Sequence, residues 1–386
     1  MKKIIILYDF LKELGGLERV MFFQANVLKK LYDVELLFSY VSEKEKERIG
    51  KEFAFNDFRK ISQIGKSRNE NVQFFSTLLF PGKLKQRKAD LIISHSFMAS
   101  RMVHVKKKNE KTKFIAMIHH PPNFLYERNL KWVNNSSRFF AYILGLFFGD
   151  ILRRADRKSV RNADSVIANS NYTRKRIKEI YGINAEVIYP PISNKFVIID
   201  ERVAIKILKK FGIEKRFILM HGRMIKDKRP DLGVLAFSKI KNKDIDFIIS
   251  GTIEEEKRIR ELVNKFGIEK RVKIAGRVSE EQLLALYNAA ECLIMPTPKE
   301  DFGMTTVEAI ACGCPVIAWK DGAGPEEIIT EDLNGLLARP YDIEDFKEKV
   351  EKSLARKWNK KKVSLSSRKF SEKEIEKQLL NLVDRF

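Results

Sequence analysis

The chain has 386 residues, of which 44% are apolar, so it is too long for one ordinary core and too hydrophobic for a disordered protein. Its net charge of +23 is uneven: residues 1–190 hold 36 Lys and Arg against 19 Asp and Glu, and the remainder holds 38 against 32. No run reaches the ~20 apolar residues of a transmembrane helix. Three cysteines argue against a disulfide framework and favour a reducing compartment.

Strands and helices alternate along the whole chain, which predicts parallel sheets covered by helices on both faces. In the first half, apolar runs predict strands at 2–8, 34–40, 90–96, 113–119, 164–170 and 185–190. The strongly basic charge of this half would attract nucleic acid, an anionic membrane or a phosphorylated ligand, and charge alone does not choose among them.

Two short stretches of this half are candidates for ligand contact. Gly15 and Gly16 follow the first strand and open a helix, but they match neither the G-x-G-x-x-G nor the Walker pattern, so they predict a tight turn or a close backbone approach. His119 and His120 end the fourth strand. Adjacent strand residues point to opposite sides, so the pair is unsuited to one metal, and we expect one histidine to be packed and the other to face the cleft.

The run RFFAYILGLFF at 138–148 is apolar and aromatic, with basic runs on both sides. It is too short to span a bilayer, so it is either a core helix or an interfacial one. Because the basic charge lies in the same half, we expect this half to contact an anionic membrane surface.

The second half predicts strands at 216–222, 245–251, 271–276, 291–296, 314–319 and 334–339, with amphipathic helices at 279–290 and 342–357. Two prolines stiffen the segment between the halves. The prediction is an α/β protein with two doubly wound domains facing a cleft. The expected boundaries are an N-terminal domain at 1–190, a linker at 191–196, a C-terminal domain at 197–365, and a C-terminal helix within 366–386 that packs back on the N-terminal domain.

Two acids, Glu300 and Glu308, flank the loop between a buried strand and a helix that starts near Gly303. A helix N-terminus exposes about four unpaired N–H groups and suits a phosphate. Placed by the sequence in the first helical turn, Glu308 either complements the helix dipole or accepts two hydroxyls of a ribose. Glu300 would then face hydroxyls at the other end of the same ligand, as in a sugar attached to a nucleoside diphosphate.

Arg223 and Lys228 follow the first strand of the second half, in HGRMIKDKRP. Arginine can fork two phosphate oxygens and lysine adds a point charge, although a solvated basic loop is the simpler alternative. The acidic triplet at 244–246 resembles a metal-binding D-x-D, but it precedes its strand on the amino side, so we interpret it as a solvated strand start.

Several runs in order match one family. They are GGLERV, ANSNYTRKRI, VIYPPISNKF, GRMIKDK, IAGRVSEEQLLALYNAA, the pair of glutamates with seven residues between them, and GCPVIA. The chain resembles the retaining glycosyltransferases with two Rossmann-like domains, the GT-B class, family 4. The resemblance covers most of residues 1–340. IHHPPNFLYE and VIYPP look most like mannosyltransferases of lipid-linked or lipopolysaccharide oligosaccharide assembly.

The resemblance implies a set of donor-binding residues. Arg223 and Lys228 would hold the diphosphate, helped by the backbone amides of Gly303, Met304 and Thr305. Asp301 stands where the family usually has a glycine, which puts the conformation of this loop in question.

The same resemblance implies the remaining roles. Glu308 would hold the ribose, Glu300 the hydroxyls of the transferred sugar, and Val278 the base through its backbone. Gly16 would lie near the phosphates, and His119 would face the sugar. The candidate catalytic residues are therefore Glu300, His119, Arg223 and Lys228.

The resemblance implies hexosyl transfer, mannose favoured, from a nucleotide sugar to a glycan or lipid-linked acceptor. No metal and no cofactor are expected, and fixed cations and N–H groups would stabilise the leaving diphosphate. The expected location is the cytoplasm, with peripheral attachment to the cytoplasmic face of the membrane. A sugar-nucleotide epimerase and a basic nucleic-acid-binding protein are the competing hypotheses, although the latter leaves the acid pair unexplained.

Overall fold

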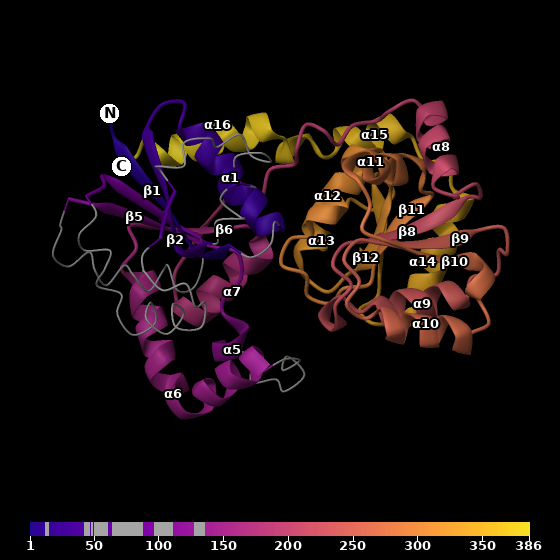
Figure 1. The fold of residues 1–386 in the computed structure, drawn as a ribbon, viewed down its shortest axis with the longest axis horizontal. Helices are drawn as coiled ribbons and strands as arrows, with labels where there is room; N and C mark the ends of the chain where they lie inside the picture. Colours follow the sequence, from indigo (N-terminus) through magenta and orange to yellow (C-terminus); the bar gives the residue numbers. More distant parts are fainter. Residues whose placement is uncertain are drawn as a thin grey trace. The chain divides into compact units, whose positions relative to one another are not determined.

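The structure, a computed structural model, describes residues 1–11, 15–41, 47, 49, 61–63, 88–95, 111–126 and 136–386, without the side chains of 10, 39, 61–63, 123–124 and 136–148. The chain forms two compact units: unit 1 holds residues 1–191 and 375–386, and unit 2 holds residues 192–374. In each unit, helices cover a sheet (Figure 1).

Unit 1 is built on a seven-stranded sheet in the order β3-β2-β1-β4-β5-β6-β7, and every neighbouring pair of strands is parallel. The strand order reverses between β1 and β4, which makes this the switch point where open α/β sheets bind ligands. Its elements are β1 (Lys3–Leu11), α1 (Gly16–Leu28), β2 (Asp33–Val41), β3 (Ile61–Gln63), β4 (Leu91–Ser94), β5 (Lys113–Ile118), α5 (Asn123–Tyr126), α6 (Ser136–Arg161), β6 (Ser165–Ala168), α7 (Asn171–Tyr181), β7 (Glu186–Val187) and α16 (Glu372–Val383).

Unit 2 is built on a six-stranded parallel sheet in the order β10-β9-β8-β11-β12-β13, whose switch point lies between β8 and β11. Its elements are α8 (Glu201–Lys210), β8 (Phe217–His221), η5 (Lys226–Lys228), α9 (Pro230–Ser238), β9 (Asp246–Ser250), α10 (Glu256–Lys265), η6 (Glu269–Arg271), β10 (Val272–Gly276), α11 (Glu280–Ala289), β11 (Cys292–Met295), α12 (Met304–Ala311), β12 (Val316–Trp319), α13 (Gly324–Ile328), β13 (Gly335–Ala338), α14 (Ile343–Ala355), α15 (Lys360–Leu365) and η7 (Arg368–Phe370).

Strand β1 shows why its sheet needs helices on both faces. Successive side chains of a strand point to opposite sides. Ile4 and Ile6 accordingly join the core cluster that contains α1 and α16, whereas Ile5 and Leu7 join the cluster that contains residues of α6 and α7. All four are at most 1% exposed. A continuous apolar run of this kind is typical of a parallel strand buried on both faces.

The predicted fold class is confirmed, with every predicted strand present. The bounds differ at the edge strand β7, which ends at Val187, before Tyr189 and the two prolines that cannot donate to a ladder. Strand β3 was not predicted, because three residues are too few to show an alternating pattern.

The last helix, α16, belongs to unit 1 rather than to the unit that precedes it in the chain. Its side chains Ile375, Leu379, Leu382 and Val383 are at most 1% exposed and lie in the same core cluster as β1 and α1. In Figure 1 this yellow helix runs beside α1. At its far end, Arg385 forms a two-pronged ion pair with Glu186. The core of unit 1 is therefore completed by residues that follow all of unit 2.

We predict that Leu379→Ala lowers the free energy of unfolding of unit 1 by about 2–5 kcal/mol, because it leaves a cavity in a packed core. The control Asn381→Ala, on the exposed side of the same helix, should change it by no more than about 0.5 kcal/mol. Hydrogen exchange distinguishes the units: amides of β1 should lose protection in the first variant while those of β8 keep theirs. Equal losses in β1 and β8 would contradict the assignment of α16 to unit 1.

Candidate functional site

The candidate residues of unit 2 gather at the switch point of its sheet. Arg223 and Lys228 follow β8, and Glu300 and Gly303 follow β11. Strands β8 and β11 are parallel neighbours, so both loops leave the same edge of the sheet. This is where a ligand can contact both loops without displacing a strand.

Lys228 and Glu300 meet in this structure. The Lys228 ammonium bonds Oε2 of Glu300, and the two side chains are 34% and 18% exposed. Arg223 lies on the same loop and is exposed. A half-buried lysine that already faces a carboxylate is ready to bind an anion once the carboxylate takes another partner.

The turn that carries Lys228 is fixed on both sides. The Thr297 hydroxyl, in the loop after β11, donates to the Lys228 carbonyl at 3.3 Å. The next residue, Arg229, has φ of 50°, a left-handed conformation that is costly for a residue with a side chain. Its guanidinium bonds both carboxylate oxygens of Asp231, with Nε 2.9 Å from Oδ1, which compensates for this strain.

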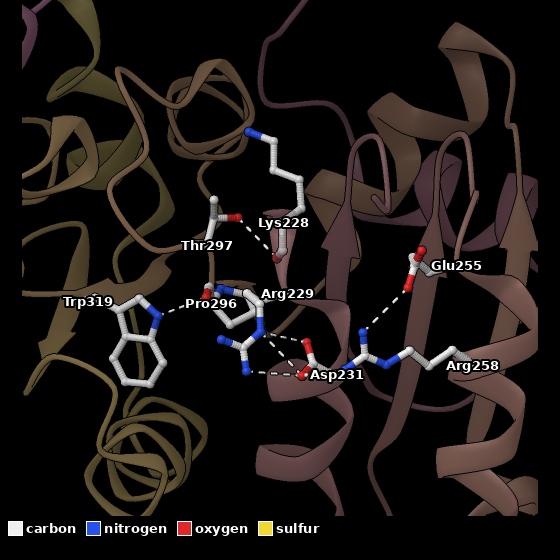
Figure 2. Close-up of polar contacts among 8 residues, drawn as sticks. All are labelled: Lys228, Arg229, Asp231, Glu255, Arg258, Pro296, Thr297 and Trp319. Atoms are coloured by element: carbon white, nitrogen blue, oxygen red, sulfur yellow. Dashed lines mark hydrogen bonds and ion pairs between the residues drawn. The ribbon is translucent and has the colours of Figure 1, made fainter. Parts of the chain in front are cut away.

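Figure 2 shows how the contacts of Arg229, Asp231 and Thr297 continue into the neighbouring elements. Asp231 also receives Arg258 of α10 at 3.3 Å, and Arg258 pairs with Glu255. On the β11 side, the Trp319 indole donates to the Pro296 carbonyl at 2.8 Å. The Lys228 ammonium points away from this network in the figure, so the network positions the backbone while the ammonium pairs with Glu300.

Helix α12 begins directly after Gly303, which has φ of 96°. A side chain there would be strained by this φ, and its Cβ would lie 3.1 Å from the Thr306 hydroxyl, so glycine is required. The Gly303 carbonyl accepts the Thr306 N–H at 3.0 Å. The N–H groups of Gly303, Met304 and Thr305 precede the first helical hydrogen bond and are the ones available to a ligand.

The loop before this helix accommodates aspartate where a glycine was expected. Asp301 is outside the set of residues with positive φ, and the left-handed residue is Lys299, with φ of 50°. The Glu300 carbonyl accepts the Gly324 N–H at 2.8 Å. A Cβ on Gly324 would lie 2.4 Å from the Cα of Phe302, so the two loops contact each other through their backbones.

Glu308 differs from the prediction in its place on the helix. Because α12 starts at Met304, Glu308 is in the second turn and not in the first, so it contributes little to compensating the dipole. It is 5% exposed and accepts a hydrogen bond of 2.9 Å from the Tyr287 hydroxyl of α11. Burial, and next the Glu308 carboxylate, raise the pKa of Tyr287 well above its usual value, so it stays a donor.

Val278 and the acidic triplet lie at opposite edges of the unit 2 sheet. Val278 is half-buried between β10 and α11, at the carboxyl edge shared with the residues above. Asp246 is the first residue of β9, so the triplet is at the amino edge, as predicted.

Gly16 and His119 lie in unit 1, at the carboxyl ends of β1 and β5. Gly16 is the exposed first residue of α1, with Glu18 accepting both the Gly15 N–H at 2.9 Å and the Tyr8 hydroxyl at 2.6 Å. His119 is half-buried and His120 is exposed. Burial, with His120 as a smaller cause, lowers the pKa of His119 to about 3.

Sequence reasoning missed the residues that hold these groups in place. Tyr287 was detectable in principle, because it lies four residues after Leu283 on the buried side of α11. Thr297 and Asp231 gave no signal, since short polar residues in loops are common. His95, after β4, and Gln24, on the buried side of α1, were also missed.

Both halves of the chain are similar to known proteins. Residues 204–371 match the family model described as glycosyl transferases group 1, and residues 14–196 match glycosyltransferase family 4. A mannosylfructose-phosphate synthase of Agrobacterium fabrum is 30% identical over 200 residues, which is 48% of this chain and 44% of that protein. An uncharacterised glycosyltransferase of Methanocaldococcus jannaschii is 25% identical over 350 residues, 90% of this chain and 88% of that one.

Among solved structures, Anabaena HepE in complex with UDP superposes with a TM-score of 0.77 at 17% identity, over the full length of both chains. This likeness shows the fold. The two family models together span nearly the whole chain, in the order of the two units. The chain belongs to the GT-B glycosyltransferases of the family 4 type.

Proposed function

We propose that this protein is a retaining hexosyltransferase that moves a sugar, mannose favoured, from a nucleoside-diphosphate sugar to a glycan or lipid-linked acceptor. The observation that carries the proposal is the Lys228–Glu300 pair at the unit 2 switch point, beside the N-terminus of α12. The cation and the helix amides match a diphosphate. The two separate carboxylates match the hydroxyls of the two sugars that the diphosphate joins.

The donor fits these groups as follows. Arg223, Lys228 and the amides of residues 303–305 take the diphosphate. Glu308, oriented by the Tyr287 hydroxyl, takes the ribose hydroxyls, while Glu300 turns from Lys228 to the hydroxyls of the transferred sugar. The similar HepE structure is a complex with UDP, which supports a nucleotide as part of the donor here.

Charge development in the reaction explains the use of cations. The anomeric carbon becomes oxocarbenium-like while negative charge grows on the departing diphosphate, and preorganised donors lower the barrier by binding that charge. In the proposed mechanism the acceptor attacks on the face from which the diphosphate departs, which retains configuration. The departing phosphate takes the acceptor's proton, and neither a metal nor a cofactor is needed.

The choice of mannose rests on resemblance. The segments at 118–127 and 187–191 look like those of mannosyltransferases, and a relative that is 30% identical over 200 residues is named for a mannosyl product. This chain spans less than half of that relative's length.

The acceptor side of the proposal rests on the surface of α6. Ile151 is 65% exposed and shares a helix face with Arg154, Lys158 and Arg161, which are also exposed. Helix α7 adds exposed Arg174, Lys175 and Lys178. The apolar run at 138–148 forms the first half of α6, but its side chains lie outside the described ones. One apolar residue heading a basic row suits shallow contact with an anionic membrane.

In the described part of the chain, none of the helices has the length and apolarity to cross a bilayer. We propose that the exposed basic surface of α6 in unit 1 contacts the cytoplasmic face of an anionic membrane. A lipid-linked acceptor would be available there.

The first prediction tests the chemistry. Incubation with labelled nucleotide sugars and a lipid extract in excess EDTA should yield a glycosylated acceptor. Arg223→Ala and Lys228→Ala should each lose about 2–4 kcal/mol of transition-state stabilisation, measured from kcat/KM. Formation of an epimer without transfer would instead indicate an epimerase, and a strict requirement for a divalent cation would contradict the proposed mechanism. Near-wild-type turnover of both folded variants would exclude their role.

A second prediction separates the two acids. Glu308→Gln should weaken the binding of the sugar-free nucleoside diphosphate, measured by calorimetry, because the ribose loses a charged acceptor. Glu300→Gln should leave that affinity unchanged or raise it severalfold, because Lys228 loses its competing carboxylate, while turnover falls. Tyr287→Phe is the matched control for the position of Glu308 and should change affinity in the same direction as Glu308→Gln. Equal weakening by both glutamate changes would contradict this division of roles.

A third prediction concerns the membrane. Co-sedimentation with anionic vesicles at low salt should be strong for the wild type, diminish with salt, and fall in the Arg154→Glu/Lys158→Glu variant, since each basic residue near the surface contributes about 1 kcal/mol. The control Lys257→Glu/Lys265→Glu makes the same charge change on exposed positions of α10 in unit 2 and should bind like the wild type. If both variants lose binding equally, net charge and not the α6 surface is responsible.

A further inference from the structure

Three side chains of unit 1 form a hydrogen-bonded row that ends at His119. Gln24 of α1 is 1% exposed, and His95, directly after β4, is fully buried. Nε2 of His95 lies 3.0 Å from Oε1 of Gln24, and Nδ1 of His95 lies 3.1 Å from Nε2 of His119. The row therefore connects the first helix with the carboxyl ends of two strands.

The geometry of the two imidazole rings fits a hydrogen bond between their edges. Their centres are 5.3 Å apart, farther than the two bonded nitrogens, and their planes differ by 19°. In a face-to-face stack, the two ring centres would be about as close as the nearest atoms of the two rings. Here the ring centres are much farther apart than the two bonded nitrogens, so the rings meet at their edges. An N–H of one ring can thus point along the lone pair of the other.

Both histidines are neutral at ordinary pH. Burial, with His119 as a smaller cause, lowers the pKa of His95 well below its usual value, and burial likewise lowers the pKa of His119 to about 3. A neutral imidazole has one N–H and one lone pair, so the bond made by one ring nitrogen decides the role of the other.

The direction of the row follows from its first member. Oε1 of Gln24 can only accept, so His95 must carry its proton on Nε2. Nδ1 of His95 is then an acceptor, and His119 must donate to it from Nε2. This leaves the lone pair of His119 on Nδ1, an atom for which the described residues offer no hydrogen bond.

We infer that Gln24 and His95 are positioning residues that hold His119 in its Nε2–H form and present Nδ1 as an acceptor for a substrate hydroxyl. Only the last step, the hydroxyl, rests on the proposed function. The proton position is a property of the free protein.

The held tautomer has a consequence for the kind of substrate group that His119 accepts. A lone pair accepts a hydroxyl proton, whereas it repels the oxygens of a carboxylate. His119 in this form thus suits a neutral sugar. The opposite tautomer would present an N–H at Nδ1 and could not accept the sugar hydroxyl. Because that hydrogen bond is made at the reacting sugar, its loss would lower the rate of transfer.

The test begins with the wild type in the absence of any substrate. Long-range ¹⁵N–¹H spectra of the five histidines, assigned by substitution, report which ring nitrogen carries the proton. The expected result is Nε2–H for both His95 and His119 near pH 7. A proton on Nδ1 of His119, or a charged imidazolium, would overturn the inference.

Two variants at position 24 test the cause. Gln24→Met keeps the length of the side chain but removes the acceptor, so His119 should show a mixture of tautomers. Gln24→Glu keeps an acceptor at this position. At about pH 9 the solution is too basic for the new carboxylate to hold His95 as an imidazolium, so His119 should keep the wild-type tautomer. An unchanged tautomer in the folded Gln24→Met variant would show that Gln24 does not set it.

The activity readout separates a positioning role from a structural one. In Gln24→Met, kcat should fall roughly two- to tenfold, following the population of the Nδ1–H form, while the affinity for the nucleoside diphosphate stays that of the wild type. A proportional loss of both would indicate general damage and contradict the inference. If no nucleotide sugar is ever transferred while the spectra are as expected, the proposed function fails and the tautomer assignment stands.

Discussion

The burial of both faces of each sheet is the constraint on which the rest of this protein depends. Because β1 sends alternate side chains into two separate cores, helices must cover both sides, and the connections that allow this make all strands parallel. Parallel strands bring every outgoing loop to the same edge. The candidate residues of unit 2 are therefore neighbours through topology, although 85 positions separate Arg223 from Glu308 in the chain.

Around that edge, the Lys228–Glu300 ion pair is partly exposed, and other partners hold Glu308 and the turn of Lys228 in place without neutralising either charge. Tyr287 orients Glu308 without neutralising it, and Thr297 with Asp231 fixes the turn of Lys228 through its backbone and its neighbour. In unit 1, Gln24 and His95 do the same for His119 without adding charge. Orientation by dipoles keeps the ionic groups free to respond to a ligand, whereas a fully buried ion pair would have compensated them.

The sequence predicted the fold class and the loops that leave the carboxyl edge of the unit 2 sheet, and it failed where single contacts decide. The buried strands were predictable because hydrophobic runs and turn residues mark them, and Lys228 and Glu300 could be placed at the carboxyl edge of the sheet because both follow strands. Strand β3 was missed because it is too short, and the helical turn of Glu308 was misplaced because the start of α12 depends on the left-handed Gly303. Tyr287, His95 and Gln24 look like ordinary core residues until their partners are known.

The position of α16 has a consequence for synthesis. The segment that completes the core of unit 1 is translated only after all of unit 2, so unit 2 can fold as a contiguous stretch while unit 1 waits with one side of its sheet uncovered. During this interval Ile4, Ile6 and their neighbours on that face lack the cover that α16 provides. The order of translation thus lets unit 2 complete its core before unit 1 can complete its own.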